Sequence, residues 1–227
     1  MRAAALIPNY DNGRTLGGVI ERTLAVIPDV VVVDDGSRDG SWPVIESFRG
    51  RIRSLRHPEN LGKGAALRDG FAALSAAGFT HAIALDADAQ HFPEDLPQLL
   101  AASMAEPAAL VIGVRDLKAA GAPRKSRFGL ACANAALRLF AGVRCRDTQS
   151  GFRSYPLAAI QALPLQGDRY DLEMEVLFAA ARAGIPIREV PIRVTYAPEG
   201  GRVTHFRPVR DFVQIGVRVA RTLWRLR

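Results

Sequence analysis

The residues best suited to chemistry in this chain are acids that directly follow a short apolar run. Asp86, Asp88 and Gln90 come after the apolar residues 82–85. Because side chains of a strand repeat every two residues, an extended backbone here would point all three toward the same side. Sparse sites of this kind bind Mg²⁺ or Mn²⁺ and leave the ion free to hold phosphate oxygens and water. The pattern predicts a divalent metal site at these three residues, with His91 as a loop residue rather than a fourth ligand.

Two further polar clusters lie earlier in the chain, and each also has an ordinary structural explanation. Residues 8–12 are turn formers that follow the first apolar run. Asp34 and Asp35 precede an expected helix, where an acid can cap the N-terminus. Two adjacent acids at the end of a strand also suit the imino hydrogen of a nucleobase or a ribose hydroxyl.

A third cluster, residues 60–65, places Lys63 between two glycines just before an expected helix. Glycines let the backbone approach a phosphate, and a helix N-terminus offers unpaired N–H groups. The spacing differs from that of the phosphate-binding loop of nucleotide hydrolases. The cluster alone fits a solvated lysine as well as a phosphate contact.

The last cluster, residues 146–153, contains Asp147, and residues 170–175 follow downstream with Glu173. Glu173 is explained by the first turn of a helix, where the helix dipole favours an acid. Asp147 has no such explanation. Asp147 is therefore expected to take part in the chemistry of the site.

Apolar runs and helix-period segments alternate along the chain, which predicts an α/β fold with a mostly parallel sheet covered by helices on both faces. In such sheets ligands bind at the carboxyl ends of the strands. Residues 116–127 are polar and are predicted to form a mobile loop beside the site. The expected strands are residues 3–7, 30–33, 52–55, 82–85, 110–113, 149–155 and 185–194, and the expected helices are residues 15–26, 41–48, 64–77, 95–104, 128–141 and 171–183.

Length and composition agree with one globular domain. The chain has 227 residues, of which 48% are hydrophobic. No apolar run reaches the roughly 20 residues of a membrane-spanning helix, and the first apolar residues are expected to form a strand rather than an export signal. Cys132 and Cys145 have no metal-site spacing, which favours a reducing, cytoplasmic setting.

The positive charge is concentrated at the C-terminus. The net charge is +7, and residues 202–227 contain seven arginines and one aspartate. Residues 208–227 are predicted to form a basic amphipathic helix that either packs on the domain or adheres to an anionic bilayer. The alternative to an enzyme is a non-catalytic module that binds a membrane or nucleic acid. Aromatic residues make up only 7%, and such a module leaves Asp86 and Asp88 unexplained.

Taken together in their order, these clusters resemble the family 2 glycosyltransferases of GT-A fold. The resemblance is greatest to the polyprenyl-phosphate glycosyltransferases of the dolichol-phosphate mannose synthase type, and it covers roughly residues 3–196. It implies a Rossmann-like GT-A domain over residues 1–207, with residues 208–227 as part of the same domain or as a membrane-surface contact. It also implies metal-dependent, inverting transfer of a sugar from GDP-mannose or a UDP-hexose to a polyprenyl phosphate. The alternative acceptor is a hydroxyl of a lipid or glycan precursor. Asp147 would take the proton from such a hydroxyl or, if the acceptor is a phosphate, would orient it.

The resemblance and the chemistry together give a set of expected site residues. A polyanionic acceptor requires cations, and arginine suits phosphate. The residues expected to bind the nucleotide sugar are Pro8, Tyr10, Asp34, Asp35, Lys63, Asp86 and Arg115; the catalytic residues are Asp88 and Asp147; the acceptor-binding residues are Arg127, Arg153 and Arg202; and the ligands of Mg²⁺ or Mn²⁺ are Asp86, Asp88 and Gln90.

These expectations define the partners and location of the protein. The expected partners are a nucleotide-diphosphate sugar, a lipid phosphate acceptor and an anionic membrane surface, without nucleic acid. The protein is expected to be cytoplasmic and peripheral on the inner face of the cell membrane, with no transmembrane segment.

Overall fold

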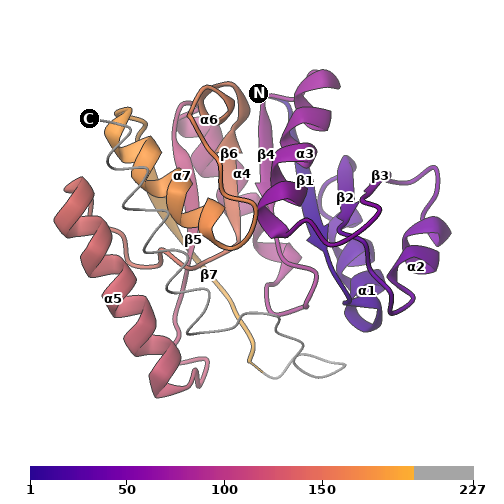
Figure 1. The fold of residues 1–227 in the computed structure, drawn as a ribbon, viewed down its shortest axis with the longest axis horizontal. Helices are drawn as coiled ribbons and strands as arrows, with labels where there is room; N and C mark the ends of the chain where they lie inside the picture. Colours follow the sequence, from indigo (N-terminus) through magenta and orange to yellow (C-terminus); the bar gives the residue numbers. More distant parts are fainter. Residues whose placement is uncertain (197–227) are drawn as a thin grey trace.

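The computed structural model describes residues 1–196, which form a seven-stranded sheet with helices on both faces (Figure 1). The predicted helix at 208–227, the predicted domain boundary at 207 and Arg202 lie outside the described residues. The strands are β1 (Ala3–Asn9), β2 (Val30–Asp34), β3 (Arg53–Arg56), β4 (His81–Ala84), β5 (Leu110–Arg115), β6 (Arg153–Pro156) and β7 (Ile187–Ile192). The helices are α1 (Gly13–Leu24), α2 (Ser41–Ser47), α3 (Lys63–Ala76), α4 (Leu96–Ala105), α5 (Arg124–Ala141), α6 (Leu157–Gln161) and α7 (Asp171–Arg182), with a 3₁₀ turn at Pro93–Asp95.

The sheet is mostly parallel, as the sequence predicts. The strand order is β3-β2-β1-β4-β6-β5-β7, and β1 pairs in parallel with both β2 and β4. β6 is the exception, because it lies antiparallel between β4 and β5. The carboxyl ends of β1, β2 and β4 therefore meet at one edge of the sheet, where their following loops converge.

Alternate side chains of the central strand β1 enter two separate cores. Leu6 packs with Phe71 of α3 on one face, and Ile7 packs with Leu16 of α1 on the other. A parallel strand buried on both faces reads as a continuous apolar run, which is why residues 3–7 are recognisable in the sequence. A Cβ added at Gly70 of α3 would lie 2.4 Å from Leu6 Cδ1, so a glycine at this position lets α3 approach the sheet closely.

Two predicted boundaries differ most from the structure. Residues 124–127, predicted as part of a loop, form the first turn of α5, because Pro123 fits the N-terminal boundary of a helix and cannot continue the preceding turn. Residues 149–152, predicted as strand, precede β6, which begins only at Arg153. The short helix α6 was not predicted, since five residues are too few to show a helical period.

Within residues 1–196, no helix is both long enough and apolar enough to span a bilayer.

Candidate active site

The loop after β4 carries the two acids of the predicted metal site. Asp86 and Asp88 follow the strand by two and four residues, and the backbone turns at Ala89, whose φ is +58°. The expectation that an extended backbone continues through residue 90 is therefore wrong. Thr15 Oγ1 of α1 donates a hydrogen bond of 2.7 Å to the carbonyl of Ala87, which fixes the loop against α1.

Gln90 and Asp88 contact each other directly. The backbone N–H and the side-chain amide of Gln90 donate to the two carboxylate oxygens of Asp88 at 3.0 and 2.8 Å. Burial and the neighbouring charge of Asp86 raise the pKa of the Asp88 carboxyl. The turn thus brings Asp88 and Gln90 together through a local hydrogen-bonded ring rather than through strand alternation.

Lys63 connects this loop to two other parts of the chain. Its Nζ lies 2.5 Å from Asp86 Oδ1 and 3.1 Å from Glu173 Oε1, and all three side chains are mostly buried. Burial alone would lower the pKa of Lys63, but the carboxylates of Asp86 and Glu173 outweigh it and raise that pKa. Burial likewise acts to raise the pKa of Asp86, and Lys63 reverses the effect and lowers it. The ammonium group therefore lies between the carboxylates of Asp86 and Glu173.

Gly151 allows this approach. A Cβ added there would lie 2.6 Å from Asp86 Oδ2 and 2.9 Å from Lys63 Nζ, so a side chain would collide with the ion pair. Three polar clusters of the sequence thus meet at one point, with Lys63 from α3, Asp86 from the loop after β4 and Gly151 from the segment before β6.

His91 is buried beside this group. Its Nδ1 lies 3.8 Å from Asp86 Oδ2, and its ring packs against Phe152 with 5.4 Å between centroids. Neither ring nitrogen has a hydrogen-bond partner among residues 1–196. Burial lowers the pKa of His91 to about 4, so the ring is neutral at physiological pH.

Arg115, at the end of β5, forms a two-pronged ion pair with Asp147. Its Nε and Nη2 donate to Oδ2 and Oδ1 of Asp147 at 2.7 and 2.9 Å, and the backbone N–H of Arg115 adds a third contact at 3.2 Å. Asp147 is fully buried. Burial acts to lower the pKa of Arg115, but its bond to Asp147 raises it. Both carboxylate oxygens are engaged by Arg115, an arrangement that favours the orienting role of Asp147 over its role as a general base.

The first two clusters interlock at the ends of β1 and β2. Asn9 Nδ2 donates to Asp34 Oδ1 at 2.9 Å and to Ser37 Oγ at 3.1 Å. Asp34 Oδ2 accepts no hydrogen bond within the described residues, although Arg56 Nε lies 3.4 Å away. Pro8 is buried in β1, and the following Tyr10 is only partly buried.

Asp35 supports the third cluster. Its Oδ1 accepts from Leu61 N at 2.9 Å and faces His57 Nδ1 at 2.7 Å, and its Oδ2 accepts from Gly62 N at 2.8 Å. His57 Nε2 in turn lies 2.9 Å from Asp69 of α3. Asp35 therefore holds the loop that carries Lys63.

The predicted acceptor arginines differ in their surroundings. Arg153 is fully buried, and its three guanidinium nitrogens donate to the backbone carbonyls of residues 148, 150 and 173. This corrects its predicted role, because the geometry makes it a framework residue that joins the β6 segment to α7. Arg127 lies in the first turn of α5, where its Nε is buried and has no hydrogen-bond partner within residues 1–196.

Comparison with known proteins identifies the family. The model of glycosyl transferase family 2 matches residues 4–165. The chain belongs to this family. The undecaprenyl-phosphate mannosyltransferase of Micrococcus luteus is 30% identical over 203 residues, which cover 85% of this chain and 83% of that protein. The polyprenol monophosphomannose synthase of Mycolicibacterium smegmatis is 29% identical, covering 86% of this chain and 77% of that protein.

Solved structures show the same architecture. The glucosyl-3-phosphoglycerate synthase of Mycobacterium tuberculosis superposes with a TM-score of 0.73 at 20% identity, covering 99% of this chain and 79% of that one. Another of its structures is a complex with Mg²⁺ and UDP. The mannosyl-3-phosphoglycerate synthase of Rubrobacter xylanophilus gives a TM-score of 0.74 at 20% identity, covering 99% and 73% of the two chains. These structures confirm the predicted GT-A fold, and the family match confirms the predicted enzyme class.

The carboxylates of this glycosyltransferase fit a metal ion that binds the protein and a phosphate ligand at the same time. No cluster of three or more His, Cys, Asp or Glu residues within 1–196 has the arrangement of a metal cage. Mg²⁺ typically binds through one or two carboxylates together with phosphate oxygens and water. Asp86 and Asp88, both partly exposed at the carboxyl end of β4, match that sparse arrangement.

Three residues of the site were assigned no role in it from the sequence. Glu173 was interpreted as an ordinary first-turn acid, although it shares Lys63 with Asp86 across 110 residues of chain. His57 belongs to no motif of the sequence, and only its position just after β3 could have indicated a place in the site. Gly151 belongs to the cluster of residues 146–153, but no contact was assigned to it.

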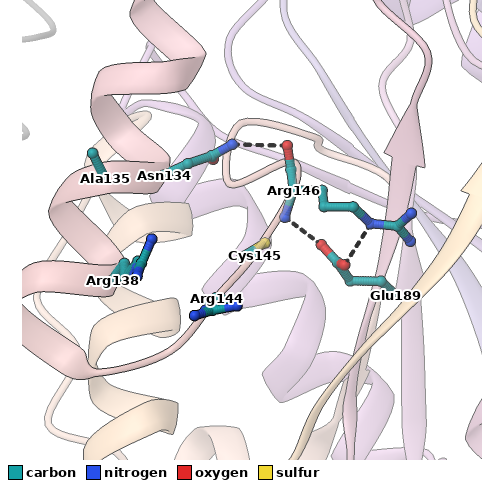
Figure 2. A pocket seen from close by; sticks show the side chains of 7 residues that line it. All are labelled: Asn134, Ala135, Arg138, Arg144, Cys145, Arg146 and Glu189. Atoms are coloured by element: carbon teal, nitrogen blue, oxygen red, sulfur yellow. Dashed lines mark hydrogen bonds and ion pairs between the residues drawn. The ribbon is translucent and has the colours of Figure 1, made fainter.

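A cavity of about 290 Å³ lies elsewhere, at the C-terminal end of α5. Figure 2 shows Arg138, Arg144 and Arg146 around it, with Arg146 bonded to Glu189. Its lining residues include neither Asp86 nor Asp88, so the cavity is separate from the candidate active site.

Proposed function

We propose that this family 2 glycosyltransferase moves a hexosyl group from a nucleoside-diphosphate sugar to a polyprenyl phosphate, with inversion at the anomeric carbon. The observation that carries the proposal is the convergence of Asp86, Asp88, Lys63 and Arg115 at the carboxyl edge of the sheet. Support comes from relatives whose names specify lipid phosphate acceptors, among them the undecaprenyl-phosphate mannosyltransferase of M. luteus.

The donor side requires positive charge beside the leaving group. Asp86 and Asp88, with Gln90 nearby, would hold Mg²⁺ or Mn²⁺, which supplies charge neutralisation to the departing diphosphate when bound. The Mg²⁺ and UDP in the M. tuberculosis complex support this choice of cofactor. Lys63 and Arg115 add two fixed cations from the protein. Pro8, Tyr10, Asp34 and Asp35 form or support the part of the site that receives the base and ribose.

The acceptor side is best explained by a phosphate nucleophile. A phosphate monoester has a second pKa of about 6, so it is largely dianionic at neutral pH and needs no general base. Asp147 is already bonded through both oxygens to Arg115. Its role in the proposal is to orient Arg115, while Arg127 and Arg202 bind the acceptor phosphate and Arg153 is left out.

The same proposal places the protein at a membrane. A polyprenyl phosphate resides in a bilayer, so the enzyme works as a peripheral protein on the inner face of the cell membrane. The basic residues 208–227 provide contact with an anionic surface, and nucleic acid is not a partner.

The decisive experiment separates the two acceptor chemistries. Purified full-length protein is incubated with Mn²⁺ or Mg²⁺, a panel of GDP- and UDP-sugars, and either polyprenyl phosphate or the matching polyprenol. Release of nucleoside diphosphate and formation of a glycosylated lipid are measured. We expect both only with the phosphate. Equal turnover with the polyprenol would refute the phosphate acceptor, and no turnover with any pair would refute the proposed function.

A further inference from the structure

Glu173 belongs to the buried ion-pair group of Lys63 and Asp86, but the proposed function gives it no role. Its Oε1 lies 3.1 Å from Lys63 Nζ, and the same ammonium group lies 2.5 Å from Asp86 Oδ1. We propose that Glu173 is a positioning residue that retains Lys63 at the site when Asp86 turns to a divalent cation. The lysine then changes its partner and does not leave. The inference rests on the proposed function for one feature, the cation at Asp86 and Asp88.

A divalent cation and the ammonium group of Lys63 compete for Asp86. Lys63 engages Oδ1 of this carboxylate, and Oδ2 lies 3.8 Å from Nδ1 of His91. Two cations that share one carboxylate repel each other, so a carboxylate that binds Mg²⁺ or Mn²⁺ holds a neighbouring ammonium group less strongly. Binding of the cation at Asp86 therefore requires another carboxylate for Lys63.

The surroundings of Lys63 keep its ammonium group in the interior. The side chain is only 15% exposed, and a Cβ added at Gly151 would lie 2.9 Å from Nζ, so the segment before β6 lies directly against it. The ring of Tyr170 is also near, with its centroid 5.9 Å from Nζ. A buried ammonium group without a partner is strongly disfavoured. A second carboxylate within reach is what allows Lys63 to stay beside the diphosphate.

Asp86 and Glu173 differ in how firmly the fold holds them. Glu173 lies in the first turn of α7, and its backbone carbonyl accepts a hydrogen bond of 2.6 Å from the fully buried Arg153. Its side chain is 10% exposed, whereas that of Asp86, in the loop after β4, is 28% exposed. Asp86 is therefore the carboxylate that can face a cation from solution, and Glu173 is the one that stays with the lysine.

The charge of the group supports the same role. Lys63 contributes one ammonium group, and Asp86, Asp88 and Glu173 contribute three carboxyl groups. With all three carboxyl groups ionised, the group carries two net negative charges, which one divalent cation neutralises. Without Glu173, Lys63 would cancel one of the two charges that attract the cation.

Two other roles for Glu173 explain less of the geometry. Within residues 1–196, no three His, Cys, Asp or Glu residues are arranged to hold a metal, so Glu173 does not form a cage with Asp86 and Asp88. A purely structural pair between α3 and α7 would explain the contact of Glu173 with Lys63. It would not explain why the same lysine also contacts Asp86. Retention of Lys63 accounts for both contacts.

A double-mutant cycle on metal affinity tests the exchange of partners. The full-length wild-type protein, Glu173→Gln, Lys63→Met and the double variant are titrated with Mn²⁺ alone, and free Mn²⁺ is measured by electron paramagnetic resonance. In the wild-type background, Glu173→Gln should weaken Mn²⁺ binding at least about thirtyfold, because Lys63 then depends on Asp86 alone. In the Lys63→Met background the same substitution should weaken it less than about fivefold, since no lysine needs to be retained.

Two outcomes of the cycle overturn the proposal. Equal losses in both backgrounds would show that Glu173 acts on the cation directly and not through Lys63. An unchanged affinity in Glu173→Gln, whatever its thermal stability, would make the contact with Lys63 a structural pair only. If Glu173→Gln does not fold, Glu173→Asp replaces it, because this variant keeps the charge one methylene farther from Nζ. A loss of about threefold is then expected, and an unchanged affinity would again overturn the proposal.

Asp168→Asn is the matched control for the loss of a negative charge. Asp168 is exposed and pairs with Arg68 of α3, the helix that begins with Lys63, and its removal should change Mn²⁺ affinity less than about twofold. An equal loss in this control would assign the effect to the general field of the protein and overturn the role of Glu173.

The titration separates this inference from the proposed function, because it needs no donor sugar, acceptor or turnover. Wild-type protein that binds no Mn²⁺ would overturn the metal site of the proposed function and this inference with it. Mn²⁺ binding that is insensitive to Glu173→Gln would overturn only the retention of Lys63 by Glu173.

Discussion

Two neighbouring parts of the candidate site use their charges differently. Around Asp35, a buried carboxylate meets two backbone N–H groups and a histidine that is itself fixed to α3. Around Asp86, a carboxylate shares the ammonium group of Lys63 with Glu173, and the buried nitrogens of His91 have no partner within residues 1–196. The arrangement around Asp35 fixes a loop, whereas the charged groups around Asp86 can pair with a ligand in place of one another. A site that binds and releases a charged ligand needs a fixed framework and charged groups that can change partner.

The largest expected effect is a loss of turnover, and it concerns the part of the site around Asp86. Asp88→Asn keeps the size of the side chain but removes a negative charge from the metal site, so we expect activity to fall at least about 10³-fold. The melting temperature should change by less than about 2 °C. Nucleoside diphosphate release and thermal unfolding are measured together, with Asp116→Asn, an exposed acid after β5, as the control. Activity near the wild-type level would remove Asp88 from the catalytic machinery.

The next largest effect is a loss of stability, and it concerns the part of the site around Asp35. Asp35→Asn replaces one acceptor oxygen with an amide that cannot accept from the backbone N–H groups it faces, and we expect a loss of about 3 kcal/mol in the free energy of unfolding. Chemical denaturation measures this loss. Asp29→Asn, which disturbs only an exposed pair with Arg53, is expected to cost less than about 1 kcal/mol. Equal losses for the two variants would contradict the framework role of Asp35.

A smaller effect concerns the competition between Lys63 and a metal for Asp86. Lys63→Met removes the ammonium that neutralises Asp86, so we expect Mn²⁺ alone to bind roughly tenfold more tightly, while turnover falls because a cation near the diphosphate is lost. Calorimetric titration with Mn²⁺ measures the affinity, with Lys118→Met as the exposed control. Weaker Mn²⁺ binding in Lys63→Met would show that Lys63 organises the metal site instead of competing for it.

The smallest expected change in turnover follows from the pairing of Asp147 with Arg115. If Asp147 only orients Arg115, Asp147→Asn should lower kcat less than about tenfold and act mainly on KM, whereas loss of a general base costs about 10²–10⁴-fold. The assay is run at a temperature where circular dichroism shows the variant folded. Arg115→Gln should reproduce the KM effect. A fall of 10³-fold in kcat for Asp147→Asn alone would restore the general base and a hydroxyl acceptor.

The local parts of the fold were predictable because each is encoded within a few residues. Residues 4–7, 30–33 and 82–85 are buried on both faces and therefore form continuous apolar runs in the sequence. Their alternation with helices predicts a parallel sheet, and with it the meeting of Asp34 and Asp86 at one edge. The reversed direction of β6 has no such local signal, since it depends on pairing with both β4 and β5.

The contacts that define the site were less predictable because they join distant residues. Glu173 is separated from Lys63 by 110 positions, and a first-turn acid reads the same whether or not it meets a lysine. Arg153 looks like a surface cation in the sequence, but three backbone carbonyls satisfy it in the interior. The pairing of Asp147 with Arg115 likewise depends on the packing of β5 beside β6.

The central claim is that Asp86 and Asp88 hold a divalent ion together with the diphosphate of the donor. Electron paramagnetic resonance of Mn²⁺, titrated into the protein with and without a nucleoside diphosphate, tests it most directly. We predict one tightly bound Mn²⁺ per chain that requires the nucleotide and is lost in both Asp86→Asn and Asp88→Asn, but not in Asp116→Asn. Nucleotide-dependent Mn²⁺ binding that persists in both variants would contradict the account.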